Sequence, residues 1–427
     1  MDEELTLKQI LAEPRTMDDL HIPQNMVIDL IFRLLYNEGN VALVRFTEVL
    51  KIPKGLIDEI LMWMQKEHLV EVSKASVELG RLGNVYTLTG AGEERAIAAM
   101  DRSQYVGPVP VSIPYYNRAM EVQTKAVQKV SAAQVRAALS HLILPDTFHR
   151  MIGPAINSGK SLFLYGPPGN GKTTIAMAIA KLLSGTEPIW IPYAISAGGQ
   201  VIQINDRLVH KQVAVEKGKT AEFGRVDMRW TLIERPAVTV GGELKMEALD
   251  LRHDPIAKFY EAPLQLKANG GMFLIDDFGR QQVSTTDLLN RWIVPLESSI
   301  DFLRLQSGQT LVVPFRQLTV FSTNLDPNNL VDDAFLRRIQ MKVCVNSPDE
   351  KLFFQIFSVM AKQLNVQFGK EAFLYLLQKW YREPGRKMQA VHPRDILKVA
   401  AAISDYDGKP AVLTPELVDD ACRSYFV

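Results

Sequence analysis

A glycine-rich octapeptide, Gly-Pro-Pro-Gly-Asn-Gly-Lys-Thr at residues 166–173, constrains this chain more than any other segment. It follows an apolar run at residues 162–165 and opens a helical pattern over residues 175–183. The order predicts strand, loop and helix. Glycines let the backbone curl so that successive N–H groups point at phosphate oxygens, and the helix N-terminus adds partial positive charge. We therefore expect a loop that binds a triphosphate.

Each residue type in this loop suits that role. Lys172 is expected to meet the outer phosphates and Thr173 to place its hydroxyl on Mg2+. Asn170 and the two prolines restrict the loop before a ligand arrives. The alternative is an ordinary glycine turn, which the flanking strand and helix disfavour. The predicted nucleotide-binding set is Gly166, Pro167, Pro168, Gly169, Asn170, Gly171, Lys172, Thr173 and Thr174.

Composition sets outer bounds. A chain of 427 residues exceeds one ordinary core, so two or three domains are expected. Basic and acidic residues number 48 each, so no global field draws the protein onto nucleic acid or an anionic membrane. Two distant cysteines, Cys344 and Cys422, fit a reducing cytoplasm. We expect neither a signal peptide nor a transmembrane segment.

After an N-terminal tail at residues 1–16, the first domain is predicted over residues 17–105. Apolar spacing indicates helices at residues 26–35, 46–50, from 53 and from 92 to 100, and β-prone runs lie at residues 41–44, 69–72 and 84–88. The last two runs are joined by a loop that carries Gly80 and Gly83. This order resembles a winged helix, as does the passage from Tyr86 through Thr89 to Gly92.

Winged helices often bind DNA, but residues 17–104 hold nine basic and thirteen acidic residues. The helix that would enter the major groove carries Asp58 and Glu59 beside one early Lys54, whereas phosphate neutralisation normally dominates affinity for DNA. We favour protein docking, while Lys74 and Arg81 on the wing keep DNA binding open. A Pro- and Gly-rich stretch at residues 106–118 is predicted as an interdomain linker.

A second motif lies about a hundred residues after the glycine-rich loop. Residues 272–275 form an apolar run that ends in Asp276 and Asp277, the pattern of a buried parallel strand whose C-terminal edge faces a nucleotide. Asp276 is expected to hold the Mg2+ shell and Asp277 to polarise the attacking water. A core strand that runs into an acidic turn is the alternative.

Further motifs resemble the AAA+ ATPase family over about residues 120–427. The glycine-rich loop matches its Walker A motif, residues 273–277 match Walker B, and Asn324 after the apolar run 318–323 matches sensor 1. The pair Arg337 and Arg338, which follows an acidic stretch at Asp332 and Asp333, stands where the family carries an arginine finger. Arg394, in His392-Pro393-Arg394-Asp395, stands at the sensor 2 position. The resemblance implies ATP with Mg2+, and a finger that acts on the nucleotide of a neighbouring subunit.

Alternatives and one departure accompany this resemblance. Asp277 stands where the family usually has glutamate, and since catalytic positioning is sensitive to errors of about 1 Å, slow hydrolysis is expected. Paired arginines are also common on a solvated helix face, and the pattern does not choose between Arg337 and Arg338. A His-Pro-Arg-Asp helix start is also an ordinary cap.

Three other segments complete the chain. A hairpin is predicted from residues 300–305 and 311–315, after a helix at residues 286–296, and it resembles the pre-sensor-1 hairpin branch of AAA+ proteins that includes the MoxR-like ATPases. Residues 187–265 are predicted as an insert that touches substrate near a ring pore, or that only packs on the core. Its basic residues include Lys211, Lys217, Lys219 and Arg225, and Phe259 and Tyr260 either grip a polypeptide or lie in the core.

The prediction is an α/β P-loop NTPase core, a doubly wound parallel sheet, over residues 119–346, with a helical lid at residues 347–427 and the winged helix before it. The function expected is Mg-ATP hydrolysis in a homo-oligomer, a hexameric ring that remodels a protein partner in the cytoplasm. Two alternatives stay open. One is a DNA-associated ATPase docked by the winged helix, and the other is a nucleotide-gated assembly switch with slow hydrolysis.

Overall fold

The central element is a five-stranded, fully parallel sheet in the order β10-β13-β16-β5-β17. The computed structural model describes residues 6–74, 83–125, 129–145, 148–214, 224–330 and 333–426. The sheet strands are β5 (Ser161–Tyr165), β10 (Ala237–Val240), β13 (Met272–Ile275), β16 (Leu318–Thr323) and β17 (Met341–Cys344). Every residue of β13 and β16 is buried, as expected for parallel strands covered on both faces.

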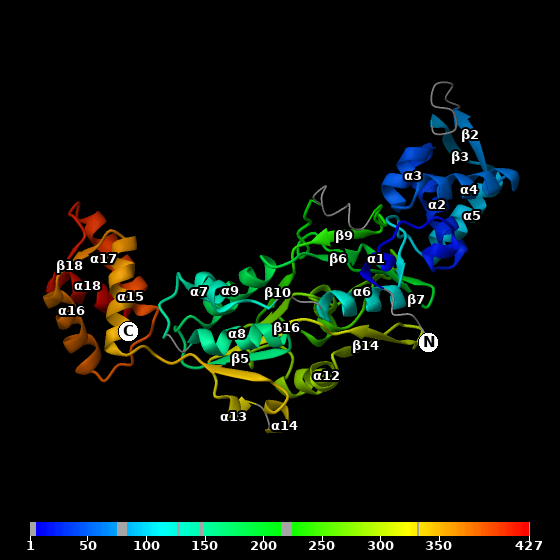
Figure 1. The fold of residues 1–427 in the computed structure, drawn as a ribbon. Helices are drawn as coiled ribbons and strands as arrows, with labels where there is room; N and C mark the ends of the chain where they lie inside the picture. Colours follow the sequence, from blue (N-terminus) through cyan, green and yellow to red (C-terminus); the bar gives the residue numbers. More distant parts are fainter. Residues whose placement is uncertain are drawn as a thin grey trace.

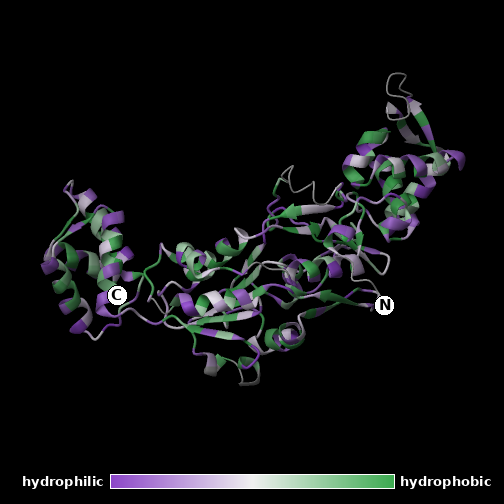
Figure 2. Cartoon of the chain, viewed as in Figure 1, coloured by the Kyte–Doolittle hydropathy of each residue, from purple (hydrophilic) through white to green (hydrophobic). Residues whose placement is uncertain are grey.

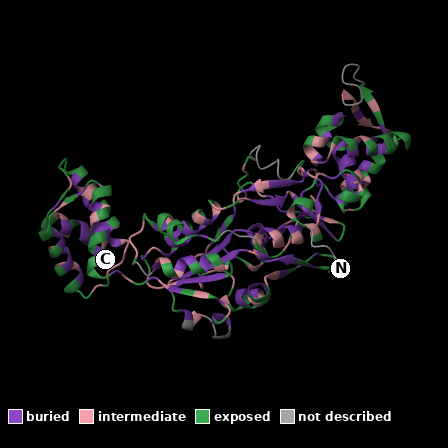
Figure 3. Ribbon diagram, viewed as in Figure 1, coloured by how far each residue is buried: buried purple, intermediate pink, exposed green. Residues whose placement is uncertain are grey.

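Helices cover both faces of this sheet. On one face, Leu162, Leu164 and Leu274 pack against α7 (Ala132–Leu139), α8 (Phe148–Ser158) and α9 (Lys172–Ser184). On the other, Phe163, Phe273 and Phe321 meet α12 (Thr285–Ser298), whose Trp292 is fully buried. Side chains alternate between faces along each strand, which gives the core two apolar layers. Figures 2 and 3 show this hydrophobic, buried interior and the exposed outer helix faces. The fold class predicted from the sequence, an α/β P-loop NTPase core, is confirmed.

Residues 17–104 form a separate helical unit at one end of the molecule (Figure 1). It contains a three-stranded antiparallel sheet in the order β1-β3-β2. Its elements are η1 (Asp18–Leu20), α2 (Gln24–Glu38), β1 (Val41–Ala42), α3 (Leu43–Leu50), α4 (Lys54–Lys66), β2 (Val70–Lys74), β3 (Val85–Leu88) and α5 (Gly90–Arg102). The strand expected at residues 41–44 stops at Ala42, because α3 begins at Leu43. Gly80 and Arg81 of the predicted wing lie outside the described residues.

Residues before this unit are not a free tail. Helix α1 (Leu7–Ile10) buries Ile10, and Leu11 beside it, in an apolar cluster with Trp190 and Trp230. Asp227 N donates to Leu11 O over 2.9 Å, so a backbone hydrogen bond holds the segment against a part of the chain more than 200 residues away. The prediction of a tail at residues 1–16 is therefore wrong for the described residues 6–16, since apolar side chains at 7, 10 and 11 give the segment a face to bury.

The predicted linker at residues 106–118 is also incorrect. Residues 111–112 form β4 (Val111–Ser112), which pairs in parallel with β7 (Ala194–Ala197), and Ile113 opens α6 (Ile113–Lys125). Proline at position 114 is tolerated because it lies in the first turn of that helix. Tyr105 and Tyr116 are buried, so the aromatic residues of this stretch serve packing.

The insert forms a second layer of β structure beside the core. Its five-stranded mixed sheet has the order β11-β12-β8-β7-β4, and β6 pairs with β9. The strands are β6 (Ile189–Pro192), β7, β8 (Gln200–Gln203), β9 (Trp230–Ile233), β11 (Arg252–His253) and β12 (Tyr260–Glu261), and the short helices are η3 (Met246–Leu249) and α11 (Leu264–Lys267). Tyr260 is buried in this sheet. Lys217 and Lys219 lie outside the described residues.

One strand assigned to the insert belongs to the core. Residues 237–240 form β10, which pairs in parallel with β13 as the edge of the central sheet. Gly241 and Gly242 therefore follow a parallel strand of the core. Periodicity alone does not distinguish a strand of the insert from an edge strand of the central sheet, because a short β-branched run has the same sequence pattern in both.

The predicted hairpin is confirmed as β14 (Ile300–Arg304) and β15 (Thr310–Pro314), with an antiparallel register from Ile300–Pro314 to Arg304–Thr310. Its Leu303 and Leu311 share an apolar cluster with Tyr116 and Met120 of α6 and with insert residues. Ala194 and Val201 of the insert in turn join the core of the N-terminal unit. The insert therefore packs against the hairpin through one apolar cluster and against the N-terminal unit through another.

The C-terminal residues form a helical unit at the opposite end of the molecule from the N-terminal unit (Figure 1). It follows two short helices, α13 (Pro327–Leu330) and α14 (Asp333–Leu336), and strand β17. Its elements are α15 (Glu350–Gln363), β18 (Gln367–Phe368), α16 (Lys370–Leu377), the π-helix η4 (Gln378–Arg382), α17 (His392–Tyr406), β19 (Val412–Leu413) and α18 (Pro415–Tyr425). In the described part of the chain, no helix is both long and apolar enough to cross a membrane.

Candidate nucleotide-binding site

The glycine-rich loop lies between β5 and α9, and its backbone needs glycine at specific positions. Gly166 has φ of +132°, and a Cβ there would stand 2.5 Å from Val345 O. Gly169 and Gly171 have φ of +72° and +86°. L-residues with side chains rarely adopt such angles, so the motif composition and the loop geometry agree.

Lys172 is the first residue of α9 and folds back over this loop. Its Nζ donates to Gly166 O and Pro167 O, each over 2.8 Å, and the residue is only 6% exposed. Burial lowers the pKa of Lys172, and the charges of Asp276 and Asp277 oppose that shift. A buried ammonium that holds only neutral carbonyls is well suited to exchange them for phosphate oxygens.

Thr173 and Asp276 fit a magnesium ion. Thr173 Oγ1 donates to Asp276 Oδ2 over 2.8 Å, so a hydroxyl and a carboxylate oxygen lie side by side beneath the loop. The described residues contain no group of three or more His, Cys, Asp and Glu side chains that could cage a metal. Two protein oxygens suit Mg2+, which in nucleotide sites keeps waters and phosphate oxygens as its other ligands.

Asp277 occupies an uncommon backbone conformation, with φ of +49°. Asp tolerates this left-handed region better than most residues with side chains. Gln281 holds the turn, because its Nε2 donates to Asp276 O over 2.9 Å and to Asp277 O over 3.1 Å. Gln281 was not singled out in the sequence, since a glutamine four residues after a carboxylate carries no recognisable signal.

Asn324 follows β16, which lies between β13 and β5 in the sheet. This strand order places its amide between the loop and the two carboxylates, and Asn324 Nδ2 donates to Asp277 Oδ1 over 3.3 Å. Two polar groups from adjacent strands therefore meet at the C-terminal edge of the sheet, beside the glycine-rich loop.

These side chains line a cavity of about 370 Å³ that also reaches the C-terminal unit. Its polar lining includes Lys172, Thr173, Asp276, Asp277 and Asn324, and its apolar lining includes residues 142–144, Ile356 and Met360. A cavity with both kinds of lining suits the phosphates and the base of a nucleoside triphosphate. The apolar lining was not predicted, because it comes from segments more than 200 residues apart.

The C-terminal unit contacts the loop directly. Ala390 N donates to Asn170 Oδ1 over 3.0 Å, and Val391 N donates to Gly169 O over 2.9 Å. Arg394, in the first turn of α17, lines the same cavity while its Nε donates to Asp395 Oδ1 over 2.8 Å. Arg394, the residue expected to contact the γ-phosphate, therefore lies at this cavity. It is held there by the start of α17 at His392.

Arg337 and Arg338 are not among the residues that line this cavity. They follow α14 and precede β17, and Arg337 is exposed. Arg338 Nε donates to Glu297 Oε1 over 2.7 Å, which ties it to the end of α12. Asp332, from the acidic stretch before this pair, lies outside the described residues.

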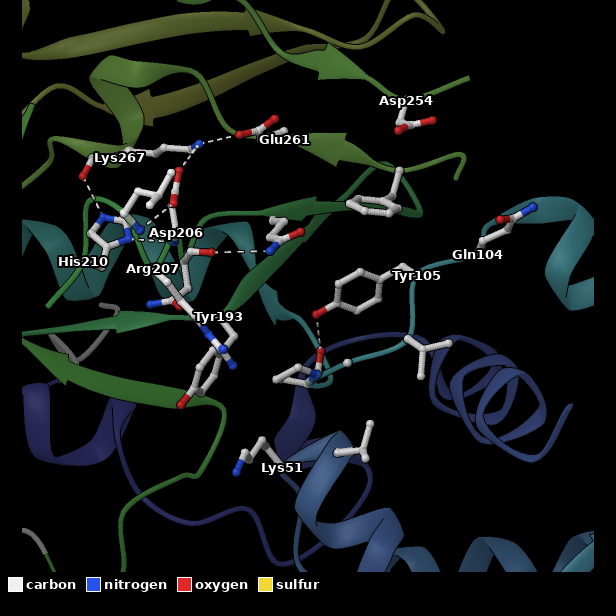
Figure 4. A pocket seen from close by; sticks show the side chains of 18 of the residues that line it. Lys51, Gln104, Tyr105, Tyr193, Asp206, Arg207, His210, Asp254, Glu261 and Lys267 are labelled. Carbon is white, nitrogen blue, oxygen red and sulfur yellow. Dashed lines mark hydrogen bonds and ion pairs between the residues drawn. The ribbon is translucent and has the colours of Figure 1, made fainter. Parts of the chain in front are cut away.

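A larger cavity of about 1270 Å³ lies between the N-terminal unit and the insert (Figure 4). On its insert wall, Lys267 Nζ donates to Asp206 Oδ2 over 2.8 Å and to Glu261 Oε1 over 2.6 Å, and buried His210 accepts from Asp206 N. Burial lowers the pKa of His210. Because acidic and basic groups are interleaved and paired, this wall offers no continuous positive track for a nucleic-acid backbone.

Sequence comparisons match short segments of the chain. A vesicle-fusing ATPase of Dictyostelium discoideum is 47% identical over 53 residues, which is 12% of this chain and 7% of that protein. The vesicular-fusion protein sec18 of Schizosaccharomyces pombe is 45% identical over 58 residues, 14% of this chain and 7% of that protein. This chain therefore spans a small fraction of these relatives. A family described as a domain of unknown function (DUF8689) matches residues 349–424.

The solved structures that match include NtrX from Brucella abortus in complex with ADP. It is 16% identical, with a TM-score of 0.40, over 77% of this chain and 65% of that one. A point mutant of Thermotoga maritima RuvB is 13% identical, with a TM-score of 0.37, over 70% of this chain and 73% of that one. The parallel sheet and the glycine-rich loop after β5 indicate a P-loop NTPase core, and the short sequence matches are to ATPases of vesicle fusion.

Proposed function

We propose that this protein is an AAA+ ATPase that hydrolyses Mg-ATP and uses the turnover to remodel a protein partner. One observation carries the proposal: Lys172, Thr173, Asp276, Asp277 and Asn324 converge from three adjacent strand ends on one cavity whose lining is partly apolar. Bound Mg-ATP would supply the phosphoanhydride that is cleaved.

The side chains divide the work by chemistry. The ammonium of Lys172 and the N–H groups of the loop bind phosphate oxygens, while Thr173 and Asp276 hold the metal. Asp277 accepts a proton from the attacking water, and Asn324 orients that water through its amide. Such positioning and charge stabilisation account for most of the catalysis of phosphoryl transfer.

Assembly into a homo-oligomer, which we propose to be a hexameric ring, would complete the site. Arg337 or Arg338 then serves as a finger on the nucleotide of the neighbouring subunit, since neither lines the cavity of its own chain. Arg394 from the lid reports on the γ-phosphate. The hydrogen bonds from Ala390 and Val391 to the loop give the lid a direct contact that turnover can alter.

Protein is favoured over nucleic acid as the partner of the N-terminal unit, which we interpret as a winged helix. The exposed residues of α4, the helix that would enter a DNA groove, include Lys54 and Lys66 at its two ends and Glu59, Met62 and Trp63 between them. Acidic and apolar groups there disfavour phosphate contacts and suit a protein surface. We assign the hairpin to the MoxR-like branch, where it and the insert would transmit nucleotide-driven motion to this unit. Free thiols at Cys344 and Cys422 suit a cytoplasmic location.

The test is ATP turnover by the full chain with and without duplex DNA, followed by identification of proteins that co-purify with Asp277→Asn. The proposal predicts turnover that DNA leaves unchanged, and a protein retained by the variant in the presence of ATP. Stimulation by DNA would favour the nucleic-acid alternative. Tight ATP binding with negligible turnover in the assembled form would favour the assembly switch.

A further inference from the structure

A smaller cavity of about 170 Å³ lies at the opposite edge of the central sheet from the nucleotide cavity. It is bounded by residues that immediately precede β5, β13 and β16, by the ends of α9 and α12, and by the base of the hairpin. It therefore shares none of its lining with the nucleotide site, although α9 joins the two.

The lining is positively charged. Lys160, Arg235 and Arg316 contribute to it, and no Asp or Glu does. Arg235 is only 5% exposed, and its Nη1 donates to Gly270 O over 2.6 Å. The Nε atoms of Arg235 and Arg316 are both buried without a hydrogen-bond acceptor. Within the described part of the chain, neither guanidinium has a carboxylate within ion-pair distance, although Glu187 acts on Arg235 from farther away. The guanidinium of Arg235 is buried and that of Arg316 is partly buried. Because buried charges are normally paired, this lining suits an anion.

Gln317 adds a second, independent sign of a missing ligand. It is 3% exposed and lines the same cavity, and neither its amide oxygen nor its amide nitrogen has a hydrogen-bond partner. Buried polar atoms in native proteins are almost always satisfied. In either orientation of the amide, its nitrogen needs an acceptor and its oxygen needs a donor. A ligand that satisfies both must accept and donate hydrogen bonds.

We propose that this cavity binds a phosphoryl group, held by Arg235 and Arg316 and by both atoms of the Gln317 amide. Near neutral pH a phosphate monoanion or dianion keeps a P–OH, which donates to Gln317 Oε1, while its other oxygens accept from Nε2 and the guanidinium groups. Fully ionised sulfate lacks that donor. The bound group would bridge Arg316 at the hairpin base to Arg235 beside the central sheet.

The experiment uses the full chain carrying Lys172→Ala, so that the glycine-rich loop does not compete for phosphate. Thermal melting and ³¹P line broadening are followed against inorganic phosphate, with sulfate and chloride at matched ionic strength. We expect a saturable rise in Tm with phosphate, and at least fivefold weaker binding of sulfate. Adding Arg235→Met should weaken phosphate binding at least tenfold, and Gln317→Leu should abolish the preference over sulfate.

Arg304→Met is the matched control, because Arg304 is an exposed hairpin arginine that does not line the cavity. Arg316→Met replaces Arg235→Met if the latter does not fold. A parallel titration of phosphate and phosphoserine at about pH 5.5, where both keep a P–OH, identifies the source, since tighter binding of phosphoserine points to a modified protein and weaker binding to the free ion. The proposal is overturned if phosphate acts no differently from chloride or sulfate, or if the cavity variants respond as Arg304→Met does. Because the background variant has no intact nucleotide loop, the result is independent of ATP turnover.

Discussion

Thr173 Oγ1 donates a hydrogen bond to Asp276 Oδ2 over 2.8 Å, although the two residues are 103 positions apart in the chain. The contact joins the start of α9 to the end of β13, with the strand that carries Asn324 between β13 and β5. A hydroxyl and a carboxylate held this close, beside the Lys172 ammonium, define where a metal-bound triphosphate is expected.

Asp277→Asn should leave ATP affinity unchanged and lower kcat by roughly 100-fold or more, because the amide keeps the size of the side chain but cannot accept the proton from water. Nucleotide binding and phosphate release measured on the same preparation check this. Asp405→Asn, on the exposed surface of the lid, is the control and should behave like the parent. Equal turnover in parent and Asp277→Asn would remove Asp277 from the mechanism.

The arginine pair should act across a subunit interface. A double variant, Arg337→Ala with Arg338→Ala, and the single variant Lys172→Ala are each expected to be inactive alone. Mixed oligomers should recover part of the turnover, because some sites then combine an intact loop with an intact neighbouring arginine. Turnover as a function of mixing ratio is the measurement. No recovery in oligomers shown to contain both chains would argue that the arginines act within one chain.

Stability should depend on pH through His392 at the start of α17. Its Nδ1 lies 3.0 Å from Tyr381 Oη, and burial, with the nearby charge of Arg386, lowers the pKa of His392 from 6.5 to about 4. As the pH falls, His392 is protonated in the unfolded chain before it is protonated in the folded protein. The contribution of neutral His392 to the stability of the fold is therefore complete above pH 6.5 and declines as the pH falls towards 4. Melting temperatures measured across that pH range should show a shallower decline for His392→Phe than for the parent. Parallel curves would contradict the assignment.

Gly166→Ala should destabilise the protein by about 1–3 kcal/mol or more, because a Cβ would meet Val345 O at 2.5 Å and φ is +132°. Gly55→Ala is the matched control: Gly55 lies in α4, and a Cβ added there would have no neighbouring atom within 4 Å. That change should stabilise by about 0.4–1 kcal/mol. Urea unfolding of both variants gives the comparison, and a neutral Gly166→Ala would show that the loop adopts another conformation.

The glycine-rich loop and the paired aspartates predicted much of the core. Each follows a parallel strand, and the C-terminal ends of parallel strands lie at the same edge of a sheet. The order of motifs in the chain did not show that β16 lies between β5 and β13, which is what sets Asn324 beside Asp277. The segments interpreted wrongly, at 7–11, 111–118 and 237–240, are short, and their structure depends on distant partners such as Trp230, β7 and β13. Local periodicity carries no information about such partners.

The most direct test of the central claim is a calorimetric titration of the full chain with ATP in the presence of Mg2+, beside Lys172→Ala under the same conditions. The account predicts saturable binding by the parent that weakens when Mg2+ is removed, and no detectable binding by the variant. Absence of binding by the parent, or equal affinity in the two proteins, would contradict it.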